Sequence, residues 1–253
     1  MNLDHRIAIC FSGQIRTGVE NSINLLNYIG EMRDAVDVFI HTWDIETESP
    51  WTEENKGDIN IANIRRYVDR QTFEQIVDVY NPLDIRIDNF DFYQRSHYNR
   101  IIARGKPCVA QIPMFQTIWE SNQLKLAHER LCNSKYGAVL RTRFDINFGP
   151  NRTLLEDLQY AANKKDLFYF VDFSNKFPEA IEDVCWLSSS KIMDRVCEFI
   201  LERETTPEMN HIDWQQHMSK YLVEEGIHAR PFKDNNISIV RNKFVEQNEG
   251  KEI

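Results

Sequence analysis

The chain has 253 residues, of which 42% are hydrophobic and 11% aromatic, and this content argues against global disorder. Its formal net charge of -9 argues against nucleic-acid binding, which needs a basic face, and weakly against adhesion to anionic membranes. An acidic protein that handles phosphates must gather its few cations in one place or use a metal.

The cysteines and the N-terminus indicate the compartment. The five cysteines are scattered and form no CxxC pair, which is typical of reduced thiols in a cytosol-like compartment. Residues 1–6 are polar and lack the organisation of a signal peptide, and no apolar run approaches the roughly 20 residues that span a bilayer. We therefore expect a soluble cytoplasmic protein with no membrane segment.

The chain opens with the pattern of a β-α-β unit. Continuous apolar runs predict buried strands at residues 7–11 and 36–41, and helical spacing predicts a helix over residues 17–32. Because parallel sheets bind ligands at the carboxyl ends of their strands, the segments that follow the two strands are candidate sites.

The rest of the chain alternates between helical and extended patterns. Residues 46–58 and 88–107 are expected to be loops, and the second, basic and aromatic, to be either a functional loop near a phosphate or an acceptor, or a solvated loop without a role. Further helices are predicted at residues 61–68, 72–79, 112–132, 190–202 and 211–225. Further strands are predicted at residues 83–87, from 137 through 145, and at 167–171, 184–187 and 237–240.

These elements predict an α/β fold of three α/β/α layers around a mostly parallel central sheet. No internal repeat or low-complexity linker interrupts the chain, so we expect residues 1–253 to form a single domain.

The strongest local signal is a charged segment at mid-chain. Strand alternation places four of its polar side chains on one side, namely Arg141, Arg143, Asp145 and Asn147. Arginines provide bidentate donors for a departing diphosphate, and a divalent metal held by Asp145 and Asn147 could bridge the same phosphates. The alternative is a structural Arg–Asp network at the edge of the sheet.

The loop after the first strand is the second candidate. Gly13 lets the backbone approach a ligand, and Ser12 and Gln14 can hydrogen-bond a base or a ribose. Arg16, expected near a helix start, could meet a phosphate there. An ordinary strand–helix turn is the alternative, and neither a GxGxxG nor a Walker motif is present.

The segment after the second strand is the third candidate. Trp43 could form a stacking wall or belong to the core, Asp44 could bind a hydroxyl, and His41 would adjoin the same nucleotide site.

The motifs together resemble a known family. The Asp-x-Asn of residues 145–147 resembles the Asp-x-Asp motif of GT-A glycosyltransferases, with Asn147 in place of the second Asp, and a neutral ligand weakens metal binding. More narrowly, the chain resembles bacterial and viral glycosyltransferase-like proteins that carry "SGQxR", "HTWD" and "RxRxD" in this order. Here these motifs stand at residues 12–16, 41–44 and 141–145, and the resemblance spans residues 6–230.

The resemblance implies a GT-A-like fold and a site. It implies that a nucleotide sugar binds to Ser12, Gly13, Gln14, Arg16, His41, Trp43, Asp44, Arg141 and Arg143. It implies that Mn²⁺ or Mg²⁺ binds to Asp145 and Asn147, with His211 as a further candidate ligand. Asp183, rather than its neighbour Glu182, would deprotonate the acceptor hydroxyl.

The implied reaction transfers a sugar from a nucleotide-diphosphate sugar to a hydroxyl of a glycan acceptor, in polysaccharide or glycan assembly. Two alternatives stay open at this point. The same charged cluster could serve a nucleotidyltransferase or phosphohydrolase, or the chain could be a non-catalytic module that binds a nucleotide sugar or a glycan.

Overall fold

A computed structural model gives the structure of the chain. It describes residues 5–47, 66–103, 108–161, 166–173, 177–204, 211–232 and 237–240. Most of the loop expected at residues 46–58 and the first five residues of the helix expected at 61–68 lie outside these ranges, as does the side chain of His211.

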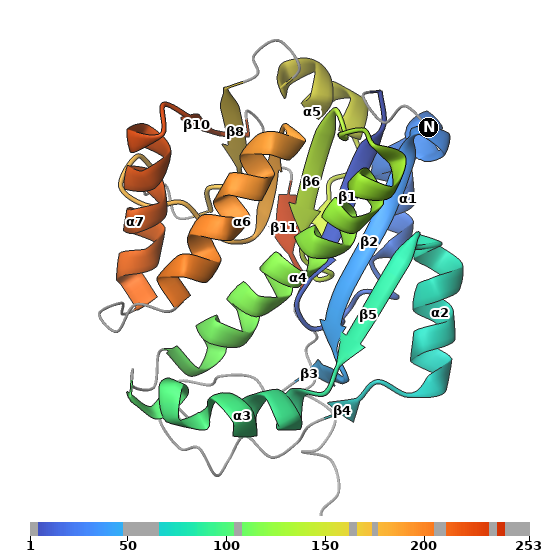
Figure 1. Cartoon of the computed structure of the whole chain (residues 1–253). Helices are drawn as coiled ribbons and strands as arrows, with labels where there is room; N and C mark the ends of the chain where they lie inside the picture. The colour runs from blue at the N-terminus through green and yellow to red at the C-terminus, as the bar shows by residue number, and fades with distance from the viewer. Residues whose placement is uncertain are drawn as a thin grey trace, which may run out of the picture.

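Seven strands form one sheet in the order β10-β8-β9-β6-β1-β2-β5 (Figure 1). Their bounds are β1 (Ile7–Ser12), β2 (Val36–Trp43), β5 (Asp84–Asp88), β6 (Ala138–Thr142), β8 (Leu167–Phe170), β9 (Cys185–Ser188) and β10 (His228–Pro231). Only β9 runs antiparallel, since it pairs antiparallel with both β6 and β8 and every other pairing in this sheet is parallel. The predicted mostly parallel central sheet is therefore confirmed.

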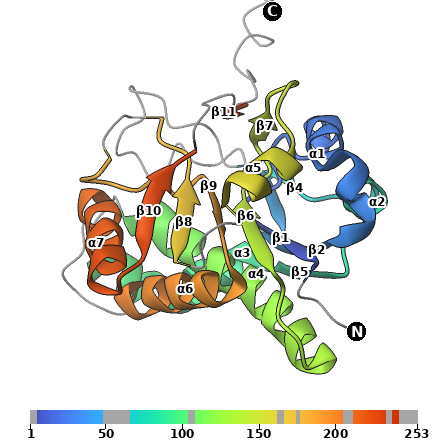
Figure 2. The same cartoon turned by 90° about the horizontal axis from the view of Figure 1, so that it is seen from above.

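Helices cover both faces of the sheet. Their bounds are α1 (Ser22–Ile29), α2 (Arg70–Tyr80), α3 (Phe90–Ala103), α4 (Cys108–Cys132), α5 (Leu154–Ala161), α6 (Ser190–Glu204) and α7 (His211–Glu224), with a 3-10 helix η1 (Gly30–Ala35) after α1. Seen from above, α4 and α6 lie along one face, and α1 and α5 lie along the other with a small two-stranded antiparallel sheet of β7 (Ile146–Phe148) and β11 (Ile237–Ile239) (Figure 2). The three-layer prediction is confirmed.

The alternation of β1 shows how the sequence builds two cores. Ile7, Ile9 and Phe11 belong to the cluster that includes residues of α1, α2 and α5, whereas Ala8 and Cys10 belong to the cluster under α4, α6 and α7. Because both faces of the strand are buried, the whole run is apolar. The alternation along each strand therefore determines on which face of the sheet a side chain near the carboxyl end of that strand lies.

Several predicted elements are confirmed within a few residues of their bounds: β1, β2, α2, β5, β8, β9, α6, α7 and β11. The helix predicted over residues 112–132 begins four residues earlier, at Cys108, so Pro113 lies inside it rather than in its first turn. The sequence did not predict α5, β10 or the pair formed by β3 (Ile45–Thr47) and β4 (Arg66–Tyr67).

Three predicted elements are wrong. The expected loop over residues 88–107 contains helix α3, which begins at Phe90. The helix expected over residues 17–32 begins only at Ser22, after a series of turns. Residues 66–67, expected in a helix, form β4 because they pair with β3.

None of the helices in the described ranges is long and apolar enough to cross a membrane. The four cysteines whose side chains are described, Cys10, Cys132, Cys185 and Cys197, are all free.

Candidate active site

The candidate site lies where three chain segments meet at one edge of the sheet. Ser12 ends β1, Arg143 follows β6, and Asp183 comes just before β9. Because β9 runs antiparallel to β6, its beginning lies at the same edge as the carboxyl ends of β1 and β6. This is the edge at which α/β sheets bind ligands.

Arg141 is buried, with 1% of its surface exposed, and joins two of these segments. Its Nε donates to Ser12 Oγ at 2.8 Å, its Nη1 donates to the backbone carbonyl of Asp183, and its guanidinium lies 4.9 Å from the ring centre of Trp186. Trp186 Nε1 in turn donates to the carbonyl of Glu182 at 2.6 Å. Two buried side chains therefore hold the backbone on which Asp183 sits.

The electrostatics of Arg141 point to a ligand. Burial lowers the pKa of Arg141 to about 10, with the charge of Asp183 opposing the decrease, so the guanidinium is still a cation at neutral pH. Its Nη2 is buried and has no hydrogen-bond partner among the described residues. An unsatisfied buried donor on a cation is costly, and such groups are concentrated at functional sites.

Asp145 is the centre of a second ion-pair group. Arg143 donates to it through Nε at 2.8 Å and Nη2 at 2.6 Å, and Arg16 donates through Nη1 at 2.7 Å. Only 1% of Asp145 is exposed. Burial alone raises the pKa of this carboxyl, but Arg143 and then Arg16 outweigh it and hold the pKa below its usual value.

The strand alternation predicted from Arg141 to Asn147 is wrong. Strand β6 ends at Thr142 and a turn follows, so Arg141 faces α4 and α6, whereas Arg143 and Asp145 lie beyond the end of the strand. Asn147 belongs to β7, where it pairs with Ser238 of β11 outside the main sheet. Arg141 therefore belongs to one group and Arg143 and Asp145 to another, the loop after β1 contacts both groups, and Asn147 lies outside them.

That loop has the backbone conformations of a strained site. Gly13 has φ of +106°, in the region that favours glycine, and no atom lies within 4 Å of the Cβ that a larger residue would add. Arg16, which is not a glycine, has φ of 47°. It does not lie at a helix start, as predicted, because α1 begins six residues later. Its partner is instead Asp145.

The donor set does not fit a divalent metal. Asp145 accepts three hydrogen bonds from arginine, one at Oδ1 and two at Oδ2, so at most one of its roughly four lone pairs is free for an ion, next to two guanidinium cations. No group of three His, Cys, Asp or Glu side chains suited to a metal occurs in the described part of the chain. Asp145 and Asn147 are therefore not arranged as a metal site in this structure.

The third predicted segment lies beside Ser12, since His41 is its register partner across β1 and β2. Trp43 is 2% exposed and packs against Phe90 and Tyr93. Asp44 accepts from the backbone N–H of Phe90 at 2.9 Å and so caps α3. Trp43 thus packs in the core and Asp44 caps a helix, and the nucleotide-binding roles predicted for this segment remain predictions.

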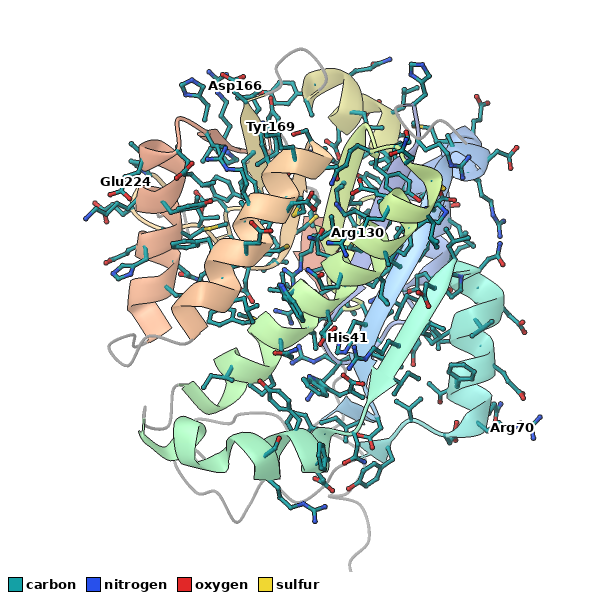
Figure 3. The ribbon with its side chains drawn as sticks, viewed as in Figure 1. His41, Arg70, Arg130, Asp166, Tyr169 and Glu224 are labelled. Carbon is teal, nitrogen blue, oxygen red and sulfur yellow. The ribbon has the colours of Figure 1, made fainter. Side chains whose placement is uncertain are left out.

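His41 is buried on the side of β2 that α4 covers (Figure 3). Its Nε2 lies 3.1 Å from Asp88, and since an ionised carboxylate only accepts, Nε2 carries the proton. Burial lowers the pKa of His41 to about 4, against the opposing effect of Asp88. His41 is therefore neutral at physiological pH.

This gives a prediction for stability. An unfolded chain protonates His41 near pH 6.5, but the folded chain does so only near pH 4, so acidification through this window favours unfolding. We expect the free energy of unfolding to fall by about 2 kcal/mol between pH 7 and pH 5. Urea titrations at the two pH values measure it. The His41→Gln variant should lose this dependence, and an unchanged slope would contradict the assignment.

Two positioning groups were not found from the sequence. Trp186 was predicted only as part of a strand, and the pairing of Arg16 with Asp145 joins residues 129 positions apart. The alternation of the strand could have placed Trp186 on the same face as Arg141, but no local signal marks the second contact.

No protein-family model matches the chain, and no curated protein sequence matches it. Solved structures do resemble it. Mouse xyloside xylosyltransferase 1 has a TM-score of 0.43 and 6% identity, over 90% of this chain and 85% of that one. The glycosyltransferase GlyE of Streptococcus pneumoniae has a TM-score of 0.45 and 10% identity, over 90% of this chain and 45% of that one. A glycosyltransferase involved in glycosylation of the PBCV-1 major capsid has a TM-score of 0.41 and 12% identity, over 90% and 81%. At these identities we base the function on the geometry of the site.

Proposed function

We propose that the chain is a glycosyltransferase that moves a sugar from a nucleotide-diphosphate sugar to a hydroxyl of a glycan acceptor. The observation that carries this proposal is the convergence of three arginines, Arg16, Arg141 and Arg143, on one edge of the sheet beside the carboxylate of Asp183. At such an edge the arginines can stabilise the negative charge of a leaving diphosphate, and the carboxylate can deprotonate the incoming hydroxyl.

The arginines provide the leaving-group side of the reaction. Arg143 is 19% exposed and Arg16 is 38% exposed, so both can reach a ligand from the sheet edge, whereas Arg141 is buried and holds the backbone of Asp183. Fixed guanidinium groups bind phosphate oxygens through parallel N–H donors and need no reorganisation when charge develops on the leaving group. The loop at Gly13 has room for the backbone to approach the nucleotide.

Asp183 provides the acceptor side. It is half-buried, its backbone is held by Arg141, and no described residue hydrogen-bonds its carboxylate. The carboxylate takes the proton of the acceptor hydroxyl, the resulting oxygen attacks the anomeric carbon, and the bond from that carbon to the diphosphate oxygen breaks. The electron pair leaves with the diphosphate, next to the arginines.

A ligand screen followed by product analysis tests this function. Nucleoside diphosphates at a hundredfold excess over their dissociation constant should stabilise the fold by about 2.7 kcal/mol, or by about 5 °C or more in Tm. The matching nucleosides are the control and should shift Tm far less, because they lack the phosphates. With a sugar donor and acceptor, a glycosyltransferase releases nucleoside diphosphate, whereas a nucleotidyltransferase releases pyrophosphate and a binding module releases neither. A screen in which no nucleoside diphosphate binds would overturn the proposal.

A further inference from the structure

The two ion pairs of Asp145 have a consequence for how the diphosphate binds. Arg143 and Arg16 donate three hydrogen bonds to this carboxylate, so a divalent cation would either use the one lone pair left on Oδ1 or displace one of the arginines. In either case a guanidinium would lie next to the incoming cation and repel it. The buried carboxylate is therefore set up to hold arginines in place.

The arginines still have donors for a ligand. A guanidinium carries five N–H groups, and Arg143 uses Nε and Nη2 on Asp145. Arg16 uses Nη1 on Asp145 and makes only a long contact, 3.4 Å, from Nε to Gln14. Both side chains are partly exposed at the edge of the sheet, and the charge of Arg143 acts on Arg141, whose Nη2 has no partner among the described residues. Three guanidinium groups thus meet the carboxylates of Asp145 and Asp183 at this edge of an acidic chain.

We infer that this chain binds a nucleoside diphosphate without a divalent cation, with Arg16 and Arg143, aligned by Asp145, in the role that a metal would otherwise take. The inference rests on the proposed function and specifies how the same site handles its leaving group. It differs from the metal site expected at Asp145 and Asn147, and the difference arises from the three hydrogen bonds that Asp145 accepts from the two arginines.

Calorimetric titration tests the inference with the nucleoside diphosphate that gives the largest thermal shift among those of adenosine, cytidine, guanosine, thymidine and uridine. The dissociation constant in EDTA should agree within about threefold with that in excess MnCl₂. Arg16→Gln and Arg143→Gln should each weaken binding about tenfold or more, because each removes charge-assisted donors. Arg70→Gln is the matched control, since Arg70 is 90% exposed, pairs only with Glu74 among the described residues, and points away from the sheet (Figure 3). It should leave the affinity unchanged.

A second measurement needs no nucleotide. The electron paramagnetic resonance signal of free Mn²⁺ should stay undiminished when the protein is added, both for the native chain and for Asp145→Asn. Loss of the free signal with the native chain and its recovery with Asp145→Asn would overturn the inference, as would an affinity for the diphosphate that rises tenfold or more with Mn²⁺. Both results would leave the proposed function standing. If no nucleoside diphosphate binds with or without Mn²⁺, the proposed function and the inference fall together.

Arg16→Gln keeps the test free of folding effects. Its side chain is the most exposed of the three arginines, and its loss leaves Asp145 paired with Arg143 through two hydrogen bonds. A folded Arg16→Gln variant that binds the diphosphate as tightly as the native chain would count against the role assigned to the arginines.

Discussion

Replacing Asp183 with asparagine is expected to slow sugar transfer by 10²- to 10⁴-fold, roughly the contribution of a positioned general base. The amide keeps the size of the side chain but cannot accept the hydroxyl proton. The backbone carbonyl that Arg141 holds is unchanged, so the segment should keep its conformation. Affinity for the nucleoside diphosphate should change little, because the arginines that bind it remain. Initial rates of diphosphate release at saturating donor and acceptor measure the effect.

Glu182 provides the control for this prediction. It is the adjacent carboxylate and is also half-buried, but it is the charge of Asp183 that acts on Arg141 and Arg143. Glu182→Gln should therefore keep most of the activity. The assignment of the base would be wrong if Asp183→Asn kept more than a third of the native rate, or if Glu182→Gln lost as much as Asp183→Asn.

The main sheet was predictable because its strands are buried on both faces. A run such as residues 7–11 is apolar throughout, and this pattern is visible without knowledge of the partner strands. The edge strand β10 was missed because its sequence, His228–Pro231, is short, has no continuous apolar run and ends in proline.

Helix α3 was missed because its start depends partly on a distant residue. Asn89 caps it locally through a hydrogen bond from the N–H of Phe92, which is a signal that the sequence does contain. The other cap is the carboxylate of Asp44, which lies 46 positions before Phe90. The aromatic and basic composition of the segment favoured a loop, but the segment forms a helix whose first turn is capped by the distant Asp44.

The sequence predicted at which edge of the sheet the site lies, but not which of its side chains bind one another. Ser12, Arg141 and Asp183 could be placed at one edge because the order of strands and helices implies it. The end of β6 at Thr142 could not be foreseen, so the alternation assumed beyond it did not describe Arg143 and Asp145, which lie past the end of the strand. Side chains that bind each other across the fold leave no periodicity in the sequence.

The second large effect is expected at Lys125, whose side chain is fully buried between α4 and α6. Its Nζ lies 2.6 Å from Asp194 Oδ1, 2.6 Å from Ser190 Oγ and 3.3 Å from Glu129 Oε2. Burial raises the pKa of Asp194, but Lys125 outweighs it and the pKa lies below its usual value. The ammonium thus compensates two carboxylates in the interior.

We expect Lys125→Met to lower the free energy of unfolding by about 3–5 kcal/mol, because it leaves Glu129 and Asp194 buried next to an apolar side chain. For a chain of this size that corresponds to a decrease in Tm of about 10 °C. Lys135→Met is the matched control: Lys135 contacts the same two carboxylates, but its side chain is 55% exposed, and its loss should cost about 1 kcal/mol or less. Urea titrations of the two variants measure the difference. If both variants lost the same free energy of unfolding, burial would not determine how much these ion pairs contribute to stability.

The same variant separates stability from function. Ser190 follows the end of β9, whereas Asp183 precedes its beginning, so the Lys125 network lies at the opposite edge of the sheet from the candidate site. Lys125→Met should therefore bind the nucleoside diphosphate with native affinity at temperatures at which it is folded. Asp183→Asn should show the reverse, with native stability and a large loss of turnover. If Lys125→Met weakened diphosphate binding in the folded state, the two edges would be coupled through β9, and the site could not be treated as independent of the α4–α6 interface.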